Sequence, residues 1–283
     1  MMRPAVVAAL AALLALPALA AGEGAPPRRI VSLNLCADQL VMSLVPPGRI
    51  ASITWLSRSE GDPDLLPLAR RLPVNHGSAE EVLAARPDLV IAGRYTTSTT
   101  RALLRRAGVR LLEIDPVQDW DGIRAVTREV AAVLGEAERG EALIADMDDR
   151  LASLALARPE APIRVIGWAG GPTDVPGRDT LFNTLLETAG GVNVGVLDAG
   201  RGGFDVERVV LRRPQALLRG VSYGATPSLR NEAARHRLLR RLYPQGQLTY
   251  PEALFGCGVP QAAVAAQALQ RSLRDIAGSA ARR

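Results

Sequence analysis

Short apolar runs alternate with amphipathic segments along most of the chain. The runs at residues 30–33, 89–92 and 163–167 are rich in aliphatic and β-branched side chains, which predicts buried strands. Between such runs, apolar residues recur at the three- and four-residue spacing of a helix. Strands that alternate with helices of this length predict an α/β fold with mainly parallel sheets flanked by helices.

The longest helical pattern lies near the middle of the chain, at residues 136–157, and predicts a helix about 33 Å long. Another amphipathic stretch, at residues 120–134, precedes it, and Gly135 predicts the stop between the two helices. Gly140 lies inside the longer helix, where we expect an exposed position and a cost of about 1 kcal/mol relative to Ala. The apolar positions of the long helix are Ala137, Ile144, Met147, Leu151 and Leu154.

One supersecondary unit occurs twice, once on each side of the long helix. Residues 80–93 are EEVLAARPDLVIAG and residues 207–220 are ERVVLRRPQALLRG, at a constant offset of 127 positions. Each copy predicts a helix, a Pro turn, a strand and a Gly; coincidence is the alternative, because this pattern is common in α/β proteins. We expect two similar lobes joined by one long connecting helix. The expected parts are an N-terminal lobe at 21–118, linking helices at 119–157 and a C-terminal lobe at 158–283.

The first twenty residues differ from the rest. Arg3, an apolar run and an Ala-Leu-Ala site ending at Ala20 predict a secretory signal peptide at residues 1–20. A membrane anchor is the alternative, although the apolar run is short for a span. Export to an oxidising compartment favours pairing of the two cysteines, Cys36 and Cys257, but the sequence alone leaves bridged and free thiols open.

Charge and motifs exclude several classes of function. The net charge is +5, every basic side chain is Arg, and these are spread over predicted helices, which argues against nucleic-acid binding. Nucleophile elbows, phosphate loops and dinucleotide fingerprints are absent from the sequence. The only histidines are His76 and His236, so a His-based triad or a zinc enzyme is not expected. We therefore expect no catalysis, no cofactor and no resident metal.

Aromatic residues are few, and several follow predicted strands. Ligands of open parallel sheets bind beyond the carboxyl ends of the strands. We therefore expect an aromatic-lined cleft between the lobes for a bulky, partly apolar ligand, with core packing as the alternative for each ring. His76 lies near this edge, and both ligand contact and loop packing stay open for it. The rings at or just past strand ends are Trp55, Tyr95, Trp168, Tyr223 and Tyr250, with Phe204 and Phe255 in nearby loops.

Two glutamates occupy equivalent helix starts in the two lobes. Ser78 and Glu81 fit a capping box, which places Glu80 at the second helical position, and Glu207 takes the same position in the second copy. Compensation of the helix dipole is the simple interpretation. Their equivalence also indicates a pair of acidic surface points for a symmetric partner.

Five segments, in this order and spacing, resemble the helical-backbone (class III) substrate-binding proteins of ABC importers, which bind ferric siderophores, haem and cobalamin. The segments are RIVSLNLCADQL at 29–40, GSAEEVLAARPDLVIAG at 77–93, LLRRAGVRLLEID at 103–115, the helix after Gly135 and the closing helix from Pro260. The resemblance implies a monomeric periplasmic protein with ligand in a shallow cleft between two lobes. It also implies that Glu80 and Glu207 pair with Arg side chains of a permease dimer in the inner membrane.

The resemblance further implies which side chains contact the ligand and what the ligand is. Our main hypothesis is capture of a ferric siderophore-type chelate, with cobalamin or haem as the alternative; a secreted hydrolase and an adaptor without transport are the other classes. The metal-ion branch uses several His ligands that this chain lacks, so free zinc or manganese is not expected. Both Cys fall in loops expected near the cleft, and we favour a bridge between them. The implied ligand contacts are Trp55, Arg94, Tyr95, Trp168, Arg201, Phe204 and Phe255.

Overall fold

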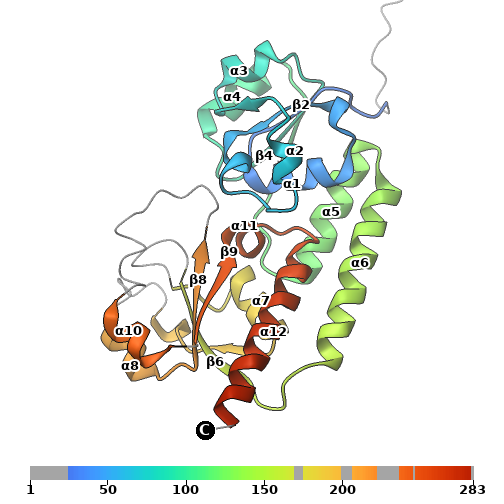
Figure 1. The fold of residues 1–283 in the computed structure, drawn as a ribbon. Coiled ribbons are helices and arrows are strands. Elements are labelled where there is room, and N and C mark those ends of the chain that lie inside the picture. The colour runs from blue at the N-terminus through green and yellow to red at the C-terminus, as the bar shows by residue number, and fades with distance from the viewer. Residues whose placement is uncertain (1–24, 169–174, 199–205, 222–235, 245, 282–283) are drawn as a thin grey trace, which may run out of the picture.

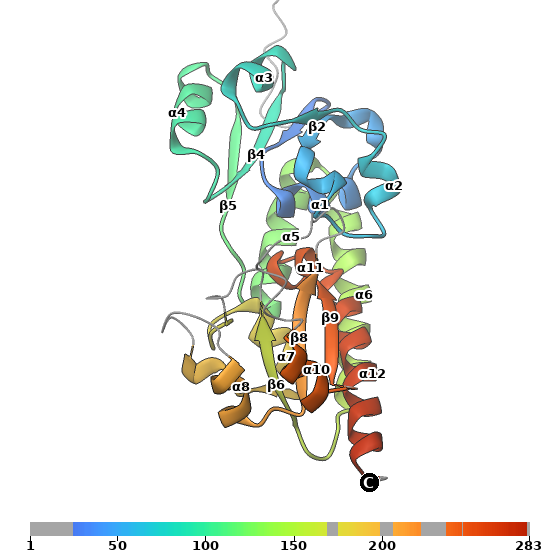
Figure 2. The same cartoon turned by 60° about the vertical axis from the view of Figure 1, so that its left-hand side comes forward.

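The computed structural model describes residues 25–168, 175–198, 206–221, 236–244 and 246–281. Within these ranges the chain forms two α/β lobes placed end to end, with α6 (Ala137–Leu156) along one side of both (Figures 1 and 2). The expected fold class is confirmed. The predicted signal peptide at 1–20 lies outside the described residues.

The N-terminal lobe contains a five-stranded parallel sheet in the order β3-β2-β1-β4-β5. The central strands β1 and β4 are wholly buried, as expected for strands covered on both faces. The strands are β1 (Ile30–Ser32), β2 (Ile50–Thr54), β3 (Val74–Asn75), β4 (Leu89–Gly93) and β5 (Leu111–Ile114). The helices are α1 (Leu35–Leu44), η1 (Pro47–Arg49), η2 (Trp55–Arg58), α2 (Leu66–Ala69), α3 (Ala79–Ala84) and α4 (Ser98–Arg106).

The C-terminal lobe contains a four-stranded parallel sheet in the order β7-β6-β8-β9. Its strands are β6 (Ile163–Trp168), β7 (Gly191–Asn193), β8 (Ala216–Val221) and β9 (Gln247–Pro251). Its helices are α7 (Leu181–Thr188), η3 (Val196–Asp198), α8 (Val206–Arg212), α10 (Arg237–Leu242), α11 (Glu252–Gly256) and α12 (Ala262–Ala281). Among the described residues, we find no helix with the length and apolar character needed to span a bilayer.

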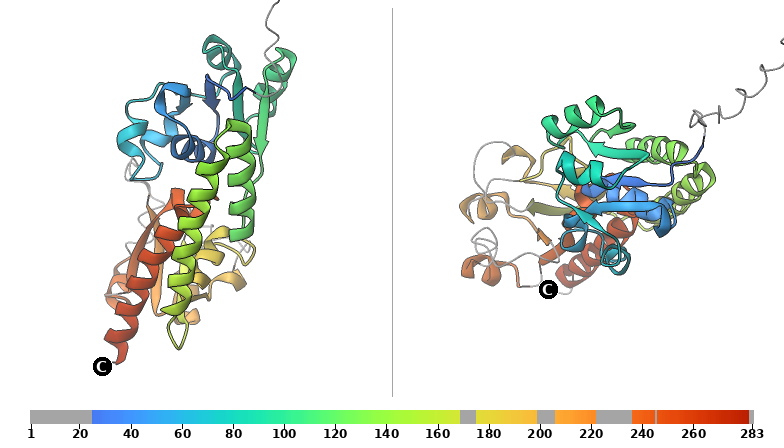
Figure 3. Two further views of the ribbon diagram at one scale, coloured as in Figure 1. Left: turned by 90° about the vertical axis from the view of Figure 1, so that its right-hand side faces the viewer. Right: turned by 90° about the horizontal axis from the view of Figure 1, so that it is seen from above.

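Three long helices pack side by side along the molecule. In the left view of Figure 3, α5 (Trp120–Leu134) and α12 lie beside the upper and lower parts of α6. Gly135 ends α5 in the left-handed conformation, with φ of 73°, as predicted. Gly140 is buried, and a Cβ there would lie 2.5 Å from Cβ of Ala131, so glycine permits close packing of α6 on α5. This corrects our description of Gly140 as an exposed weak point.

The internal repeat is structural as well as sequential. Arg86 and Arg213, 127 positions apart, both have φ of 47°, a left-handed conformation that is uncommon for residues other than Gly. In each lobe an Arg from the first strand region donates hydrogen bonds to the last carbonyls of the helix before the Pro. Arg29 bonds to the carbonyls of residues 85 and 86, and Arg164 to those of residues 212 and 213. The two lobes therefore share one local arrangement, in which an Arg side chain donates hydrogen bonds to the last carbonyls of a helix.

Several short elements differ from the expectation. Residues 252–256 form α11, where we expected a loop from 254, and the brief strands β3 and β7 have too few residues to show alternation. In the described segment 236–244, His236 precedes the short helix α10. A cluster of buried apolar side chains is continuous from the N-lobe sheet through α5 and α6 into the C-lobe, so the lobes share part of one core.

Candidate functional site

A hollow of about 120 Å³ lies where the two lobes meet. Its N-lobe wall consists of residues that follow strands β1, β4 and β5, so the carboxyl edge of that sheet faces the other lobe. Its C-lobe wall contains Gly256 and Gly258, beside α11. Pockets for whole ligands usually measure about 300–1,000 Å³, so this hollow is smaller than a site that encloses a whole ligand. The lining residues used below are Asn34, Cys36, Arg94, Tyr95, Asp115 and Val117.

A disulfide joins the lobes beside this hollow. Cys36, in the first turn of α1, is bonded to Cys257, which ends α11; their Cα atoms are 5.0 Å apart and their positions differ by 221. The structure therefore contains the bridge that the sequence left open. Cys36 also lines the hollow, so one wall is covalently attached to the opposite lobe.

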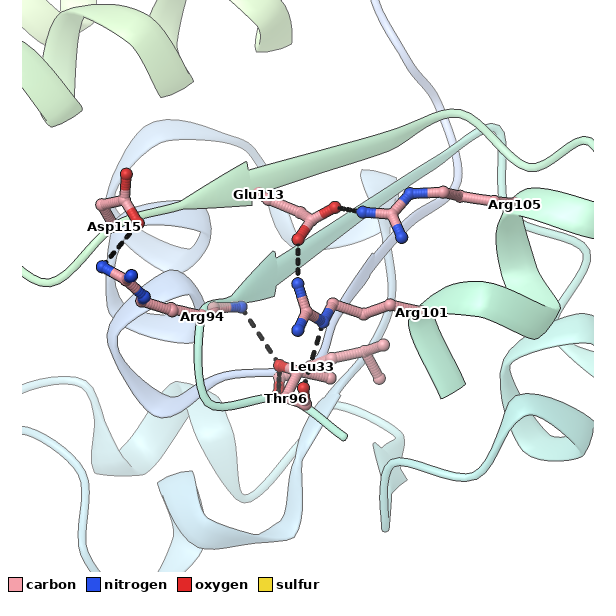
Figure 4. A network of polar contacts seen from close by, with 8 residues as sticks. Leu33, Arg94, Thr96, Arg101, Arg105, Glu113 and Asp115 are labelled. Carbon is pink, nitrogen blue, oxygen red and sulfur yellow. Dashed lines mark hydrogen bonds and ion pairs between the residues drawn. The ribbon is translucent and has the colours of Figure 1, made fainter. Parts of the chain in front are cut away.

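Arg94 and Tyr95 project from the loop after β4, at the rim of the hollow. Tyr95 is 83% exposed, and Nη1 of Arg94 lies 4.0 Å from Oδ1 of Asp115 (Figure 4). Thr96 fixes the loop, because its hydroxyl accepts the Gly93 N–H at 3.1 Å and donates to the Leu33 carbonyl at 3.2 Å. This rim therefore presents an exposed ring on a fixed loop and a cation beside a carboxylate.

A second pair of Arg side chains supports the loop from behind. Arg101 donates to the Thr96 carbonyl, and both Arg101 and Arg105 bind the carboxylate of Glu113 on β5 (Figure 4). This network ties α4 to β5 and to the loop that presents Tyr95. Its role is support, since Glu113 and Arg101 are not among the lining residues of the hollow.

Trp55 and His76 lie together at the same carboxyl edge. Thr54 and Asn75 are register partners in β2 and β3, so the next residues leave adjacent strands side by side. The rings stack with centroids 6.4 Å apart and an interplanar angle of 24°, and Trp55 is 46% exposed. The sequence placed Trp55 at a strand end but gave no sign of its pairing with His76.

Glu81 anchors His76. Its Oε1 lies 3.1 Å from Nδ1 of His76, and its Oε2 accepts the His76 N–H at 2.8 Å. These bonds, the backbone N–H of His76 foremost, lower the pKa of Glu81. The capping box is thus half formed: Ser78 Oγ accepts the Glu81 N–H, but the Glu81 carboxylate turns to His76 instead of the Ser78 N–H. A histidine held at Nδ1 by a carboxylate is typical of metal-binding imidazoles.

A buried carboxylate lies beneath Trp55. Asp38 on α1 is fully buried and accepts hydrogen bonds from Thr54 N–H at 3.0 Å, Thr54 Oγ1 at 2.5 Å and Ser57 Oγ at 2.7 Å. Burial raises the pKa of Asp38 to about 6, against the opposing effect of these hydrogen bonds. Sequence analysis missed this residue, because an Asp in the first turn of a helix is also what dipole compensation predicts.

Asp38 makes stability depend on pH in a defined direction. Its folded-state pKa exceeds the ordinary value of 3.8, so between about pH 4 and 6 the folded protein holds a proton that the unfolded chain releases. The contribution of Asp38 to the free energy of unfolding is therefore greatest below pH 4, where the carboxyl is protonated in both states. It falls by about 3 kcal/mol as the pH rises to about 6. We expect urea denaturation from pH 4 to 7 to show this change as the difference between wild type and Asp38→Asn. A difference independent of pH would contradict the assignment.

The remaining predicted site residues have different outcomes. Phe255 is 4% exposed, and its ring lies 4.4 Å from that of Tyr250 and 5.6 Å from that of Phe182, measured between centroids. The structure thus places Phe255 in the aromatic core of the C-lobe rather than on a ligand-facing surface, because α11 turns it inward. Trp168 ends β6, and only its backbone is described. Arg201 and Phe204 lie outside the described residues.

The two predicted docking glutamates are both exposed. Glu80 and Glu207 lie in the first turns of α3 and α8, which are equivalent helices of the two lobes. Both helices lie away from α6 (Figures 1 and 2). His236 precedes α10, where its Nδ1 accepts the Leu238 N–H, and it is exposed.

Comparison with known proteins gives a consistent result. The sequence model of a family described as periplasmic binding protein matches residues 30–231. Cobalamin-binding proteins from two strains of Halobacterium salinarum are 27% identical over 213 residues, which cover 69% of this chain and 54% of theirs. The chain therefore spans about half the length of the curated relatives it matches.

Solved structures show the same architecture. The periplasmic heme-binding protein RhuT from Roseiflexus sp. RS-1, in apo form, superposes with a TM-score of 0.71 at 25% identity and covers 88% of this chain and 99% of its own. The periplasmic vitamin B12 binding protein BtuF of Vibrio cholerae superposes with a TM-score of 0.68 at 18% identity, over 89% of this chain and 98% of its own. With well over half of its length matched by the family model and with two parallel-sheet lobes on a long helix, the chain belongs to the periplasmic binding protein family and has the class III fold.

Proposed function

We propose that this protein is the substrate-binding component of an ABC importer and that its cargo is a metal-centred tetrapyrrole, either a corrinoid or haem. The observation that supports this most is the pair of exposed rings, Trp55 and Tyr95, on fixed loops at one sheet edge. Exposed flat rings suit the apolar face of a macrocycle better than they suit a small hydrophilic solute. The similarity to cobalamin-binding and heme-binding proteins supports the same class of cargo.

His76 gives the proposal a specific contact. Its Nδ1 is held by Glu81, and its Nε2 has no hydrogen-bond partner among the residues that the structure describes. A neutral imidazole that is anchored in this way can donate the lone pair of its other ring nitrogen to a metal ion in the cargo. We propose that His76 contacts the metal while Trp55, stacked beside it, covers part of the ring.

A ferric siderophore stays the alternative, and one observation favours it. The guanidinium of Arg94 is 71% exposed at the rim of the hollow, where it suits an anionic chelate. The carboxylate of Asp115 close to it weakens this argument, because the pair presents little net charge. For this reason our proposal favours the macrocycles over our first hypothesis of a siderophore.

Titration decides between these ligands. We expect purified protein to bind haemin or cyanocobalamin, followed by quenching of Trp fluorescence and by the ligand's visible spectrum, and to bind a ferric hydroxamate siderophore weakly. Trp55→Ala and Tyr95→Ala should each weaken binding about fivefold, because each removes an aromatic contact of about 1 kcal/mol. His236→Ala is the matched control for His76→Ala and should bind as wild type. Tight binding of the siderophore alone would overturn the proposal.

The family also suggests location and mode of action. Its members are periplasmic substrate-binding proteins, and we propose that this chain is exported by the signal at residues 1–20 and works without catalysis. Delivery would need contact with a membrane permease, for which Glu80 and Glu207 are the proposed contacts.

A further inference from the structure

Two buried polar side chains, Asp38 and Asn75, adjoin the segments that carry Trp55 and His76. On one side, Asp38 binds Thr54 and Ser57, which flank Trp55 in the chain. On the other side, Asn75 directly precedes His76 and is 2% exposed. Its Nδ2 donates to the Ser32 carbonyl at 3.0 Å, to Ser52 Oγ at 2.9 Å and to the Ile53 carbonyl at 3.0 Å.

Together these bonds fix the edge on which the rings stand. Asn75 links the carboxyl ends of β1, β2 and β3, and Asp38 links α1 to the end of β2 and to η2. Burying a carboxylate costs free energy unless it is well hydrogen-bonded, so three donors on Asp38 mark a site where geometry is closely defined. Core stability alone does not require this arrangement, because apolar residues of similar volume fill such a space equally well.

We infer that Asp38 and Asn75 are positioning residues, which hold Trp55 and His76 stacked and ready for ligand before the ligand arrives. The inference rests on the proposed function for the statement that these two rings contact the cargo. A pre-formed platform avoids the entropy cost of ordering two side chains during binding. The N-lobe half of the site is then stationary, and the N-lobe itself does not rearrange when ligand binds.

The first test needs no ligand. In a Trp120→Phe, Trp168→Phe background, Trp55 is the remaining tryptophan, and its time-resolved fluorescence anisotropy at pH 8 reports local motion. We expect only overall tumbling in this parent protein and an added fast component in Asp38→Asn and in Asn75→Ala. Thr54→Val, which removes one hydroxyl donor, should show the fast component as well, whereas Thr54→Ser, which keeps the hydroxyl, should restore rigidity.

Ligand binding provides the second readout, with haemin and cyanocobalamin as probes. Asp38→Asn and Thr54→Val should weaken binding of whichever probe the wild type binds by about tenfold, and Thr54→Ser should not. The control is Gln270→Leu, which removes a buried side chain of α12 that donates a hydrogen bond to the Leu154 carbonyl of α6. It should lower stability without changing anisotropy or affinity.

The outcomes separate the two proposals. Unchanged anisotropy of Trp55 in Asp38→Asn, together with a loss of stability like that of Gln270→Leu, would overturn the positioning role. If Asp38→Asn fails to fold, Thr54→Val and Ser57→Ala give the same decision, because each deletes one donor and leaves the carboxylate. Failure of the wild type to bind either probe would overturn the proposed function, whatever the anisotropy shows.

Discussion

Replacing both Cys36 and Cys257 with Ser lowers the free energy of unfolding by about 5 kcal/mol. The bond closes a loop of 221 positions, and a cross-link over so long a loop removes much of the conformational entropy of the unfolded chain. For a protein of this size, such a loss corresponds to a decrease in Tm of about 10–20 °C. Urea denaturation and calorimetry of the double variant measure it directly.

Reduction supplies the control for this result. Wild type unfolded in the presence of dithiothreitol should match the double Ser variant closely, because both lack the cross-link and differ only in sulfur or oxygen at two positions. The single variants should be no more stable than the double one. A decrease of less than about 1 kcal/mol would show that the unfolded chain keeps the two segments close even without the bond.

Reversing both docking charges, with Glu80→Arg and Glu207→Arg together, abolishes uptake of the ligand by cells and leaves ligand affinity unchanged. The two side chains are exposed, lie in equivalent helices and are distant from the hollow between the lobes. In the proposed contact with a permease dimer, the reversals would replace attraction by repulsion at both ends, and like charges across an interface cost several kcal/mol.

Glu138→Arg is the matched control for these reversals. Glu138 is exposed and lies in the first turn of α6, so its reversal opposes a helix dipole in the same way. It should leave uptake intact. Normal uptake by the double Glu80, Glu207 variant would remove both residues from the docking surface, and equal loss in the Glu138 variant would show that helix destabilisation is the cause.

Much of the fold could be predicted because its signals are periodic and repeated. The stop at Gly135 and the helix at 137–156 follow from spacing alone, and the offset of 127 indicated two lobes. The correspondence between the two copies also includes the backbone conformation, because Arg86 and Arg213 are both left-handed. A left-handed backbone at an Arg is a property that no pattern of residue types displays, because residues other than Gly rarely adopt it.

The site was less predictable, since its geometry depends on contacts between segments distant in sequence. Trp55 and His76 meet because β2 pairs with β3, and a strand of two residues has no periodic signal. In the sequence, Asp38 has the features of a surface residue, and its burial results from the packing of α1 against β2. Phe255 looked like a loop residue because the five-residue helix α11 is too short to show helical spacing, and that helix directs the ring into the core.

The disulfide also sets an order of events during biogenesis. Lobes of exported proteins fold as they emerge, the N-terminal one first. Cys36 appears with that first lobe, while its partner follows 221 positions later. If the chain is exported as we propose, Cys36 stays an unpaired thiol throughout that interval, and the disulfide forms only after residue 257 has crossed the membrane. The cross-link between the lobes is then a late step of maturation.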